Sequence, residues 1–328
     1  MKRSMLFGLK ALAVAILGVW MVTGCDQSSS PNAPRYELSA QDQAAIRRVI
    51  ASDELFNNTG IDDDGAQNVE YSTDGPEALG KVAEQIDTKR WGRFGRLKFE
   101  KVEIEATSDT TATATVTYSL DGYFIIIARD TTKPNLIGAI YKKDMKNTLV
   151  HKAKLVKVDS TGNDRKDWRI VQVSGGVMSS PNPTIQITNF TIQFPDGSKL
   201  SIDDPLQYFW NRQQKRNRGD LPALAPRDTV KMYVTLTNSN NFPPEPGETV
   251  LMRYGMNHQF HRSRKLFRDD GIYPDAVAGD GVYSGYWIVS KRSGHHHGAV
   301  DVIDNGTIYD DSAPYDAVVW TLPYHVKF

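Results

Sequence analysis

The sequence predicts an α+β domain followed by an all-β domain. Three observations support this division. Helix-like spacing of apolar residues is confined to the region before residue 90, alternation typical of strands begins near Leu97, and short strands separated by turn residues follow Thr184. Helices followed by four long strands predict an α+β layer in which a curved antiparallel sheet packs on N-terminal helices. The later short strands predict a β-sandwich.

The amino-terminal segment is typical of a secretory signal. Ala11 to Val22 carries no charge and follows a basic start formed by Lys2, Arg3 and Lys10. A dozen apolar residues are too few to cross a hydrocarbon core of about 30 Å as a helix. A basic start, a short apolar run and small residues before a cleavage point predict that residues 1–24 are removed on export.

Val22-Thr23-Gly24-Cys25 resembles a bacterial lipobox, in which cleavage before the cysteine leaves it as an acylated first residue. The resemblance implies a diacylglyceryl group on Cys25 and usually an N-acyl chain such as palmitate. Two acyl chains hold a protein on a membrane stably. The expected location is the bacterial cell envelope, with the folded part periplasmic or extracellular. Which membrane is involved stays open, as does the alternative of an ordinary signal or a lone membrane helix.

Composition narrows the classes of partner. Cys25 is the only cysteine, so an acylated mature chain has no disulfide. The whole chain has 39 basic and 39 acidic side chains, and loss of the three leader cations leaves a net charge of −3. So weak a charge argues against nucleic acid as a partner. Residues 25–37 are polar and rich in serine and proline, which predicts a flexible tether.

The first predicted domain spans residues 38–177. Ser39 is a candidate N-cap for a helix that runs to about Phe56, and Pro76 favours a second short helix ending near Ile86. Alternating apolar residues then predict four antiparallel strands. The element order and the closing strand Trp168-Arg169-Ile170-Val171 resemble the nuclear transport factor two-like superfamily. That resemblance implies a cone whose cavity serves catalysis or ligand binding in some members.

A linker at residues 178–183 separates this region from a sandwich predicted over residues 184–328. The boundary rests on the glycine-, serine- and proline-rich run that starts at Ser174. Several short strands with turn residues between them are typical of an immunoglobulin-like β-sandwich, here without the cysteine pair of antibody domains.

The sharpest local pattern is an acidic, glycine-rich segment at residues 269–283. Its four carboxylates are candidate Ca²⁺ ligands. Glycines allow sharp turns that direct several oxygens to one centre, and Ca²⁺ takes six to eight oxygen ligands. The segment resembles a "DDG…AGDGVY" motif of immunoglobulin-like domains in bacterial surface proteins. Two alternatives remain, since Asp and Gly also form ordinary turns and Asp bonds its own backbone. The candidates are Asp269, Asp270, Asp275 and Asp280.

Other patterns predict less. Consecutive histidines 295–297 would point to opposite faces of a strand, which favours adventitious metal affinity over a zinc site. The sequence lacks a Gly-x-Ser-x-Gly elbow and a glycine-rich phosphate loop, so it nominates no catalytic residue. The aromatic residues expected near the cone are more typical of core than of a ligand platform. They are Trp91, Phe94, Tyr118, Tyr123 and Phe124.

These observations predict a lipid-anchored, non-enzymatic envelope protein that presents binding surfaces to a protein or glycan partner. Two alternatives stay open. One is an enzyme or small-ligand binder that uses the cavity of the cone domain, and the other is a structural or adhesive module stabilised by calcium.

Overall fold

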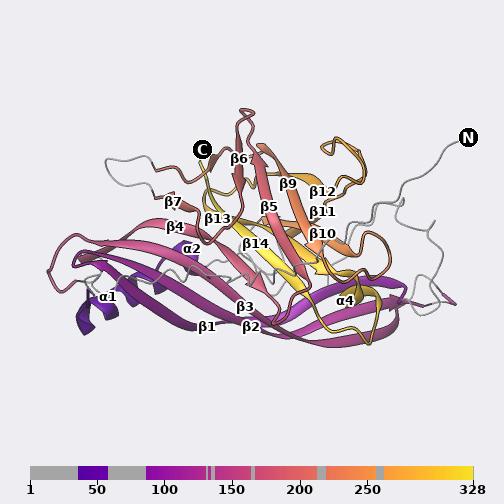
Figure 1. The fold of residues 1–328 in the computed structure, drawn as a ribbon, viewed down its shortest axis with the longest axis horizontal. Helices are drawn as coiled ribbons and strands as arrows, with labels where there is room; N and C mark the ends of the chain where they lie inside the picture. Colours follow the sequence, from indigo (N-terminus) through magenta and orange to yellow (C-terminus); the bar gives the residue numbers. More distant parts are fainter. Residues whose placement is uncertain are drawn as a thin grey trace, which may run out of the picture. The chain divides into compact units, whose positions relative to one another are not determined.

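Strands dominate the described part of the chain, which comprises residues 36–57, 86–130, 132–133, 137–163, 167–212, 219–255 and 262–327 of the computed structural model. Contacts group Tyr36–Phe328 into one unit (Figure 1). The elements are α1 Ala40–Ala51, α2 Glu54–Asn57, β1 Thr88–Ser108, β2 Thr111–Arg129, β3 Ile137–Lys157, β4 Trp168–Ser179, β5 Ile185–Gln193, β6 Lys199–Ile202, β7 Phe209–Asn211, β8 Ala223–Leu224, β9 Thr229–Asn238, β10 Glu248–Gly255, β11 Arg262–Leu266, β12 Val282–Ile288, β13 Gly294–Asp304, α4 Asn305–Tyr309 and β14 Ala317–Val326.

Two sheets contain these strands. The larger has ten strands and runs β1-β2-β3-β4-β14-β13-β10-β11, with β7 beside β4 and β8 beside β14 among the described residues. The smaller runs β12-β9-β5-β6. The long strands β1 to β3 cross below β13 and β14 in Figure 1, so that one sheet supplies two layers.

Strands β13 and β14 form the middle of three layers. Ala299 and Val319 belong to the core that also contains the inner residues of β1 to β4, whereas Val300 and Val318 belong to the core shared with the smaller sheet. Successive side chains of a strand point to opposite faces, so alternate residues enter alternate cores. This double burial explains the mainly apolar sequence of β14 and of Ala299–Ile303 in β13, where Asp301 is the exception.

The predicted fold class was wrong. The concave side of β1 to β4 is not packed mainly on N-terminal helices, and the later strands do not form a separate sandwich. Instead the middle layer covers that concave side, because β14 pairs directly with β4 through Val318↔Ser179 to Thr321↔Gly176. The smaller sheet then packs on the other face of the same strands. A sheet face buries apolar surface as effectively as a helix does.

The first part of the run that predicted a linker, residues 174–179, lies inside strand β4. A Cβ atom on Gly176 would lie 2.2 Å from Cε1 of His151, and one on Gly175 would lie 2.5 Å from the carbonyl oxygen of Thr321. These glycines therefore allow neighbouring strands to approach closely, and they do not form a flexible linker. Residues 176–179, which include the first two residues of the predicted linker at 178–183, pair with β14 and join the two halves of the larger sheet.

The amino-terminal helices are short and lie against part of the sheet. The Ser39 hydroxyl accepts a hydrogen bond from the Asp42 amide at 3.1 Å, which confirms the predicted N-cap. The expected continuous helix breaks at Ser52, and α2 follows as a separate turn. The helix predicted from Pro76 lies outside the described residues over 76–85, as do the predicted signal at 1–24 and Cys25.

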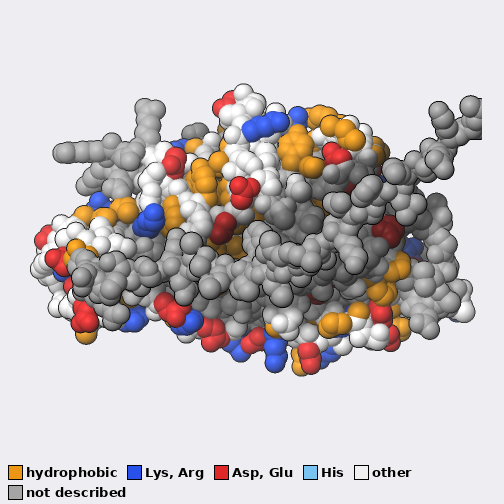
Figure 2. Space-filling model, in the orientation of Figure 1, with side chains coloured by type: hydrophobic (Ala, Val, Ile, Leu, Met, Phe, Trp, Pro, Cys, Tyr) orange, Lys and Arg blue, Asp and Glu red, His pale blue; other side chains and the backbone are white. Residues whose placement is uncertain are grey.

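Within the described residues, no helix combines the length and apolar character needed to cross a membrane. Basic and acidic side chains intersperse along the region of β1 to β3 in Figure 2. That mixture of charges is typical of a sheet face in contact with solvent. The basic segment at residues 215–218 lies outside the described residues.

Candidate functional site

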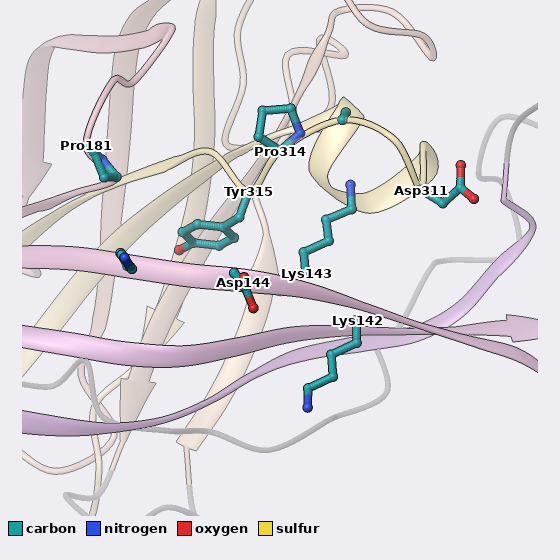
Figure 3. Close-up of a pocket in the computed structure, with 9 residues that line it drawn as sticks. Lys142, Lys143, Asp144, Pro181, Asp311, Pro314 and Tyr315 are labelled. Carbon is teal, nitrogen blue, oxygen red and sulfur yellow. The ribbon is translucent and has the colours of Figure 1, made fainter.

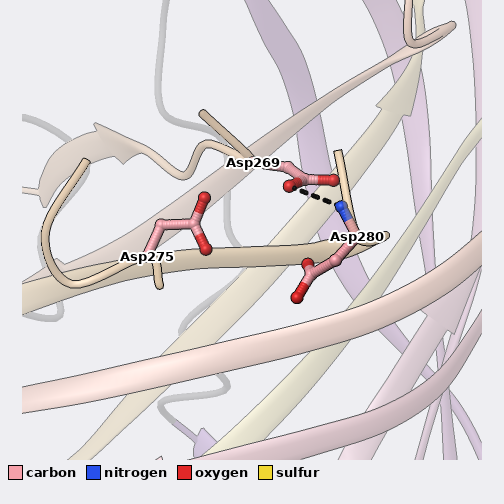
Figure 4. Close-up of side chains that lie close together, drawn as sticks. All are labelled: Asp269, Asp275 and Asp280. Atoms are coloured by element: carbon pink, nitrogen blue, oxygen red, sulfur yellow. Dashed lines mark hydrogen bonds between the residues drawn. The ribbon is translucent and has the colours of Figure 1, made fainter. Parts of the chain in front are cut away.

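Three of the four predicted calcium ligands lie together. Asp269, Asp275 and Asp280 each offer one carboxylate oxygen, and these oxygens all lie within 4.8 Å of one another (Figure 4). All three residues sit on the connection between β11 and β12. The sequence pattern therefore identified a real cluster of acidic groups.

The fourth candidate lies apart from this cluster. A carboxylate oxygen of Asp270 lies 3.6 Å from a guanidinium nitrogen of Arg268, and the other accepts the Ile272 amide at 2.9 Å. Its negative charge is thus partly balanced by a neighbouring cation. Asp270 serves as a natural comparison for the clustered residues.

Backbone amides already solvate the clustered carboxylates. Asp269 accepts the amides of Gly279 at 2.6 Å and Gly281 at 2.8 Å, and Asp275 accepts the amide of Gly271 at 2.6 Å. Gly279 and Gly281 have φ angles of 71° and 80°, a backbone region that favours glycine. These bonds shape the loop without a metal, as the turn alternative expected. They leave carboxylate lone pairs for an oxygen-seeking cation such as Ca²⁺.

A cleft of about 370 Å³ lies at the edge of β3 (Figure 3). Strand β4 pairs with β3 only from Thr148 onward, so residues 137–147 of β3 pair with β2 alone among the described strands. Pro181 follows the end of β4 and lines the cleft with the loop after α4. The lining residues are Lys142, Lys143, Asp144, Lys146, Pro181, Asp311, Ala313, Pro314 and Tyr315.

Lys143 is the residue of this cleft whose pKa shifts most among its lysines. It points from β3 toward α4 in Figure 3, whereas Lys142 points the other way. Its Nζ donates to the carbonyl oxygen of Gly306 at 2.8 Å and to that of Asp310. Burial lowers the pKa of Lys143 to about 8, although nearby Asp310 and Asp311 oppose the shift. The ammonium caps the end of α4, which makes Lys143 a structural group.

The aromatic residues expected near the concave face divide between core and surface. Trp91 and Phe124 are fully buried with ring centroids 5.3 Å apart, and Tyr118 is buried with its hydroxyl donating to the Phe56 carbonyl. Tyr123 is instead exposed, with the Nζ of Lys142 at 3.3 Å from its ring centroid. The concave face is thus occupied by packed side chains.

Sequence reasoning missed a buried charge cluster. Arg93 donates Nη2 to Asp301 at 2.8 Å and Nε to the Tyr315 hydroxyl at 2.8 Å, and Arg253 approaches Asp301 at 3.5 Å. The side chains of Arg93, Arg253 and Asp301 have no exposed surface. A signal existed, because Asp301 interrupts the apolar run Ala299–Ile303, where a charge requires a partner.

The histidine run alternates as strand geometry requires. His296 stacks on Tyr324, with centroids 5.5 Å apart, and its Nε2 donates to the Arg292 carbonyl at 2.9 Å. On the other face, Nε2 of His297 lies 3.1 Å from the Leu55 carbonyl. The upstream residues His258 and His261 lie outside the described residues.

Comparison with known proteins adds no family. No family model matches the sequence, and no curated protein matches it. Among solved structures the chain shows similarity to one of Extended-Synaptotagmin 2, described as comprising its SMP domain and two C2 domains. The identity is 7%, the TM-score is 0.14, and the match covers 85% of this chain and 93% of that one. So low a TM-score supports no inference about fold or activity.

Proposed function

We propose that this chain is a lipid-anchored protein of the bacterial cell envelope that presents binding surfaces to a protein or glycan partner. The segment Val22-Thr23-Gly24-Cys25 carries the anchoring part of the proposal. Acylation at Cys25 would make the predicted tether, residues 25–37, the connection between the lipid anchor and the folded part. The tether would allow the folded unit to contact partners near the membrane.

The side chains packed on the concave face of β1 to β4 favour a binding role over a catalytic one. Enzymes bind substrates in concave sites that expose a few polar groups. Here Trp91, Phe124 and Val319 pack within the space that the alternative of a catalytic cone requires. The buried cluster of Arg93 and Asp301 has no solvent-exposed side-chain surface, so it supports the fold instead of meeting a substrate.

The cleft at the β3 edge is the contact surface that we assign. Its walls come from β3 and from the loop between α4 and β14, and Lys142 and Lys146 are exposed there. An extended segment can add to an unpaired strand edge through main-chain hydrogen bonds. Exposed lysines beside such an edge would favour a partner with acidic groups.

The anchor is tested on the protein isolated from its own cells. The amino-terminal peptide should show by mass spectrometry a Cys25 that carries acyl chains and begins the mature chain. A Cys25→Ala variant should lose its membrane association, whereas Ser28→Ala should keep it. An unmodified Cys25 thiol on a mature, membrane-free protein would overturn the proposal.

The binding surface is tested separately with a photo-crosslinking residue placed at Lys146. Gln186, an exposed residue of β5, serves as the matched control position. The proposal expects a defined adduct from the cleft position and none from the control. Equal yields from both positions would remove the assignment of the cleft without affecting the anchor.

Calcium stabilisation is a second candidate, favoured by the convergence of Asp269, Asp275 and Asp280. A hard cation among three carboxylates would lower their mutual repulsion and fix the connection between β11 and β12. The proposal is a structural role for Ca²⁺ within a surface module. Thermal unfolding with and without Ca²⁺ tests it.

A further inference from the structure

His295 and His325 stand opposite each other on neighbouring strands. They are a register pair of β13 and β14, and their rings stack with centroids 4.8 Å apart and planes inclined by 23°. Cross-strand neighbours on one face are the closest side-chain pairs in a sheet. The pairing of β13 with β14 thus brings together two imidazoles whose residues are 30 positions apart in the sequence.

The backbone holds both histidines firmly. The His325 amide donates to the Pro222 carbonyl at 2.8 Å, and β8 pairs with β14 through His325↔Ala223. His325 therefore has strand neighbours on both sides. Side chains on rigid strands present a ligand pair more precisely than side chains on loops do.

Glu54 adds a carboxylate to the pair. Its Oε2 lies 3.2 Å from Nδ1 of His295, and the two side chains are 70% and 27% exposed. A carboxylate at Nδ1 favours the tautomer with the proton there, which leaves the lone pair of Nε2 available. Metal-binding histidines commonly have such a carboxylate behind the ligating nitrogen. The exposure leaves the pair accessible to ions from solvent.

Other described histidines make different contacts. His297 lies on the same face as His295, but its Nε2 meets the Leu55 carbonyl, and His296 lies on the opposite face. His151 is buried against Phe56 and Tyr118. The run of three histidines therefore contributes one accessible imidazole, and the second comes from β14.

We propose that His295 and His325 together bind one divalent late transition-metal ion, with Glu54 orienting His295. Imidazole nitrogens suit Cu²⁺, Ni²⁺ and Zn²⁺, and Cu²⁺ binds tightest among them by the Irving–Williams order. Water completes the coordination. The bound ion would link β13 to β14, which carry His295 and His325. The contact between Glu54 and His295 would connect α2 to the same site.

Titration of the full chain with Cu²⁺ tests the site. The protein is purified in detergent without a histidine tag, and calorimetry should show one dominant site. His295→Ala and His325→Ala should each weaken binding at least tenfold. Glu54→Gln should weaken it about tenfold, the lower end of the usual effect of an outer carboxylate. Far-ultraviolet circular dichroism and the melting temperature check that each variant is folded.

Two control variants separate this site from adventitious binding. Asp280→Asn removes a carboxylate of the acidic cluster, and His258→Ala removes a histidine outside the described residues. Both should keep the Cu²⁺ affinity within twofold. Unchanged affinity in either His295→Ala or His325→Ala, or a main site lost in a control variant, would overturn the proposal.

A measurement on the unaltered chain avoids any folding problem. Diethyl pyrocarbonate modifies accessible neutral imidazoles, and peptide mass spectrometry locates each modified residue. One equivalent of Zn²⁺ should protect His295 and His325 together. Protection of neither residue, or of only one of them, would contradict a shared ion.

Discussion

Arg93 and Asp301 form a buried ion pair across 208 positions of sequence. Nη2 of Arg93 donates to Oδ1 of Asp301 at 2.8 Å, and Nη1 donates to Oδ2. Arg93 belongs to β1 and Asp301 to β13, so the pair joins the curved strands to the middle layer. Arg253 of β10 also approaches the same carboxylate.

Asp301→Asn should destabilise the fold by about 3–5 kcal/mol, because it removes a buried carboxylate that contacts the guanidinium groups of Arg93 and Arg253. Arg93→Met should cost less, since Asp301 keeps Arg253 as a neighbour. Urea unfolding followed by tryptophan fluorescence measures both changes. A larger loss for Arg93→Met than for Asp301→Asn would show that the carboxylate is not the centre of this cluster.

Glu248 and Asp304 predict a distinct pH dependence. They are register partners on β10 and β13, and Asn238 donates to both carboxylates. Burial raises the pKa of each group, and the charge of Asp304 raises the pKa of Glu248 further. The folded state therefore holds their protons more tightly than the unfolded state does. Their contribution to stability is greatest at low pH and is lost as pH rises through the raised pKa values.

Glu248→Gln should remove part of this loss. Glutamine keeps an acceptor for the Tyr283 hydroxyl, which donates to Glu248 at 2.6 Å. The difference in unfolding free energy between variant and wild type should shift in favour of the variant from pH 4 to pH 8. Glu105→Gln, at an exposed position of β1, should show no such shift. A pH-independent difference for Glu248→Gln would contradict this explanation.

His151 predicts the opposite dependence at acidic pH. It is fully buried, and burial lowers its pKa to about 4, against the hydrogen bond to Gly175. A buried neutral imidazole resists protonation, so stability falls as pH drops from about 6.5, the ordinary histidine value, toward 4. The full effect is on the order of 3 kcal/mol, at about 1.4 kcal/mol for each unit of pKa.

His151→Gln should flatten this acidic loss, because glutamine does not titrate. Chemical unfolding of both proteins at pH 7.5 and pH 4.5 provides the comparison. The variant should be less stable than wild type at pH 7.5, where it loses packing against Phe56, and the gap should narrow at pH 4.5. A gap that stays constant would place the acid sensitivity elsewhere.

Calcium should stabilise the connection between β11 and β12. At a Ca²⁺ concentration 100 times the dissociation constant, one site adds about 2.7 kcal/mol to the stability of the folded state. Asp269→Asn and Asp280→Asn should abolish the rise in melting temperature. Asp270→Asn should keep it, because that carboxylate lies toward Arg268. An equal rise in all three variants, or no rise in wild type, would exclude calcium from this cluster.

Local patterns predicted the strands well. The predicted alternation matches β2, in which Ala112, Ala114 and Val116 are buried, and the short strands predicted after Thr184 correspond to β5 and the strands that follow it. The acidic segment was also identified, because Asp269, Asp275 and Asp280 lie close in sequence and glycines between them permit the turns. Such features depend on residues within a few positions of one another, so a single sequence reveals them.

The sequence by itself determined where strands form, where α1 begins and which carboxylates share a loop. Only the tertiary structure decided that β13 and β14 cover the concave side of β1 to β4, and that His295 meets His325. The physical reason is that an apolar face specifies burial without specifying its cover. A helix and a second sheet layer both satisfy it, and the choice depends on contacts between residues such as Arg93 and Asp301, which leave no local periodicity.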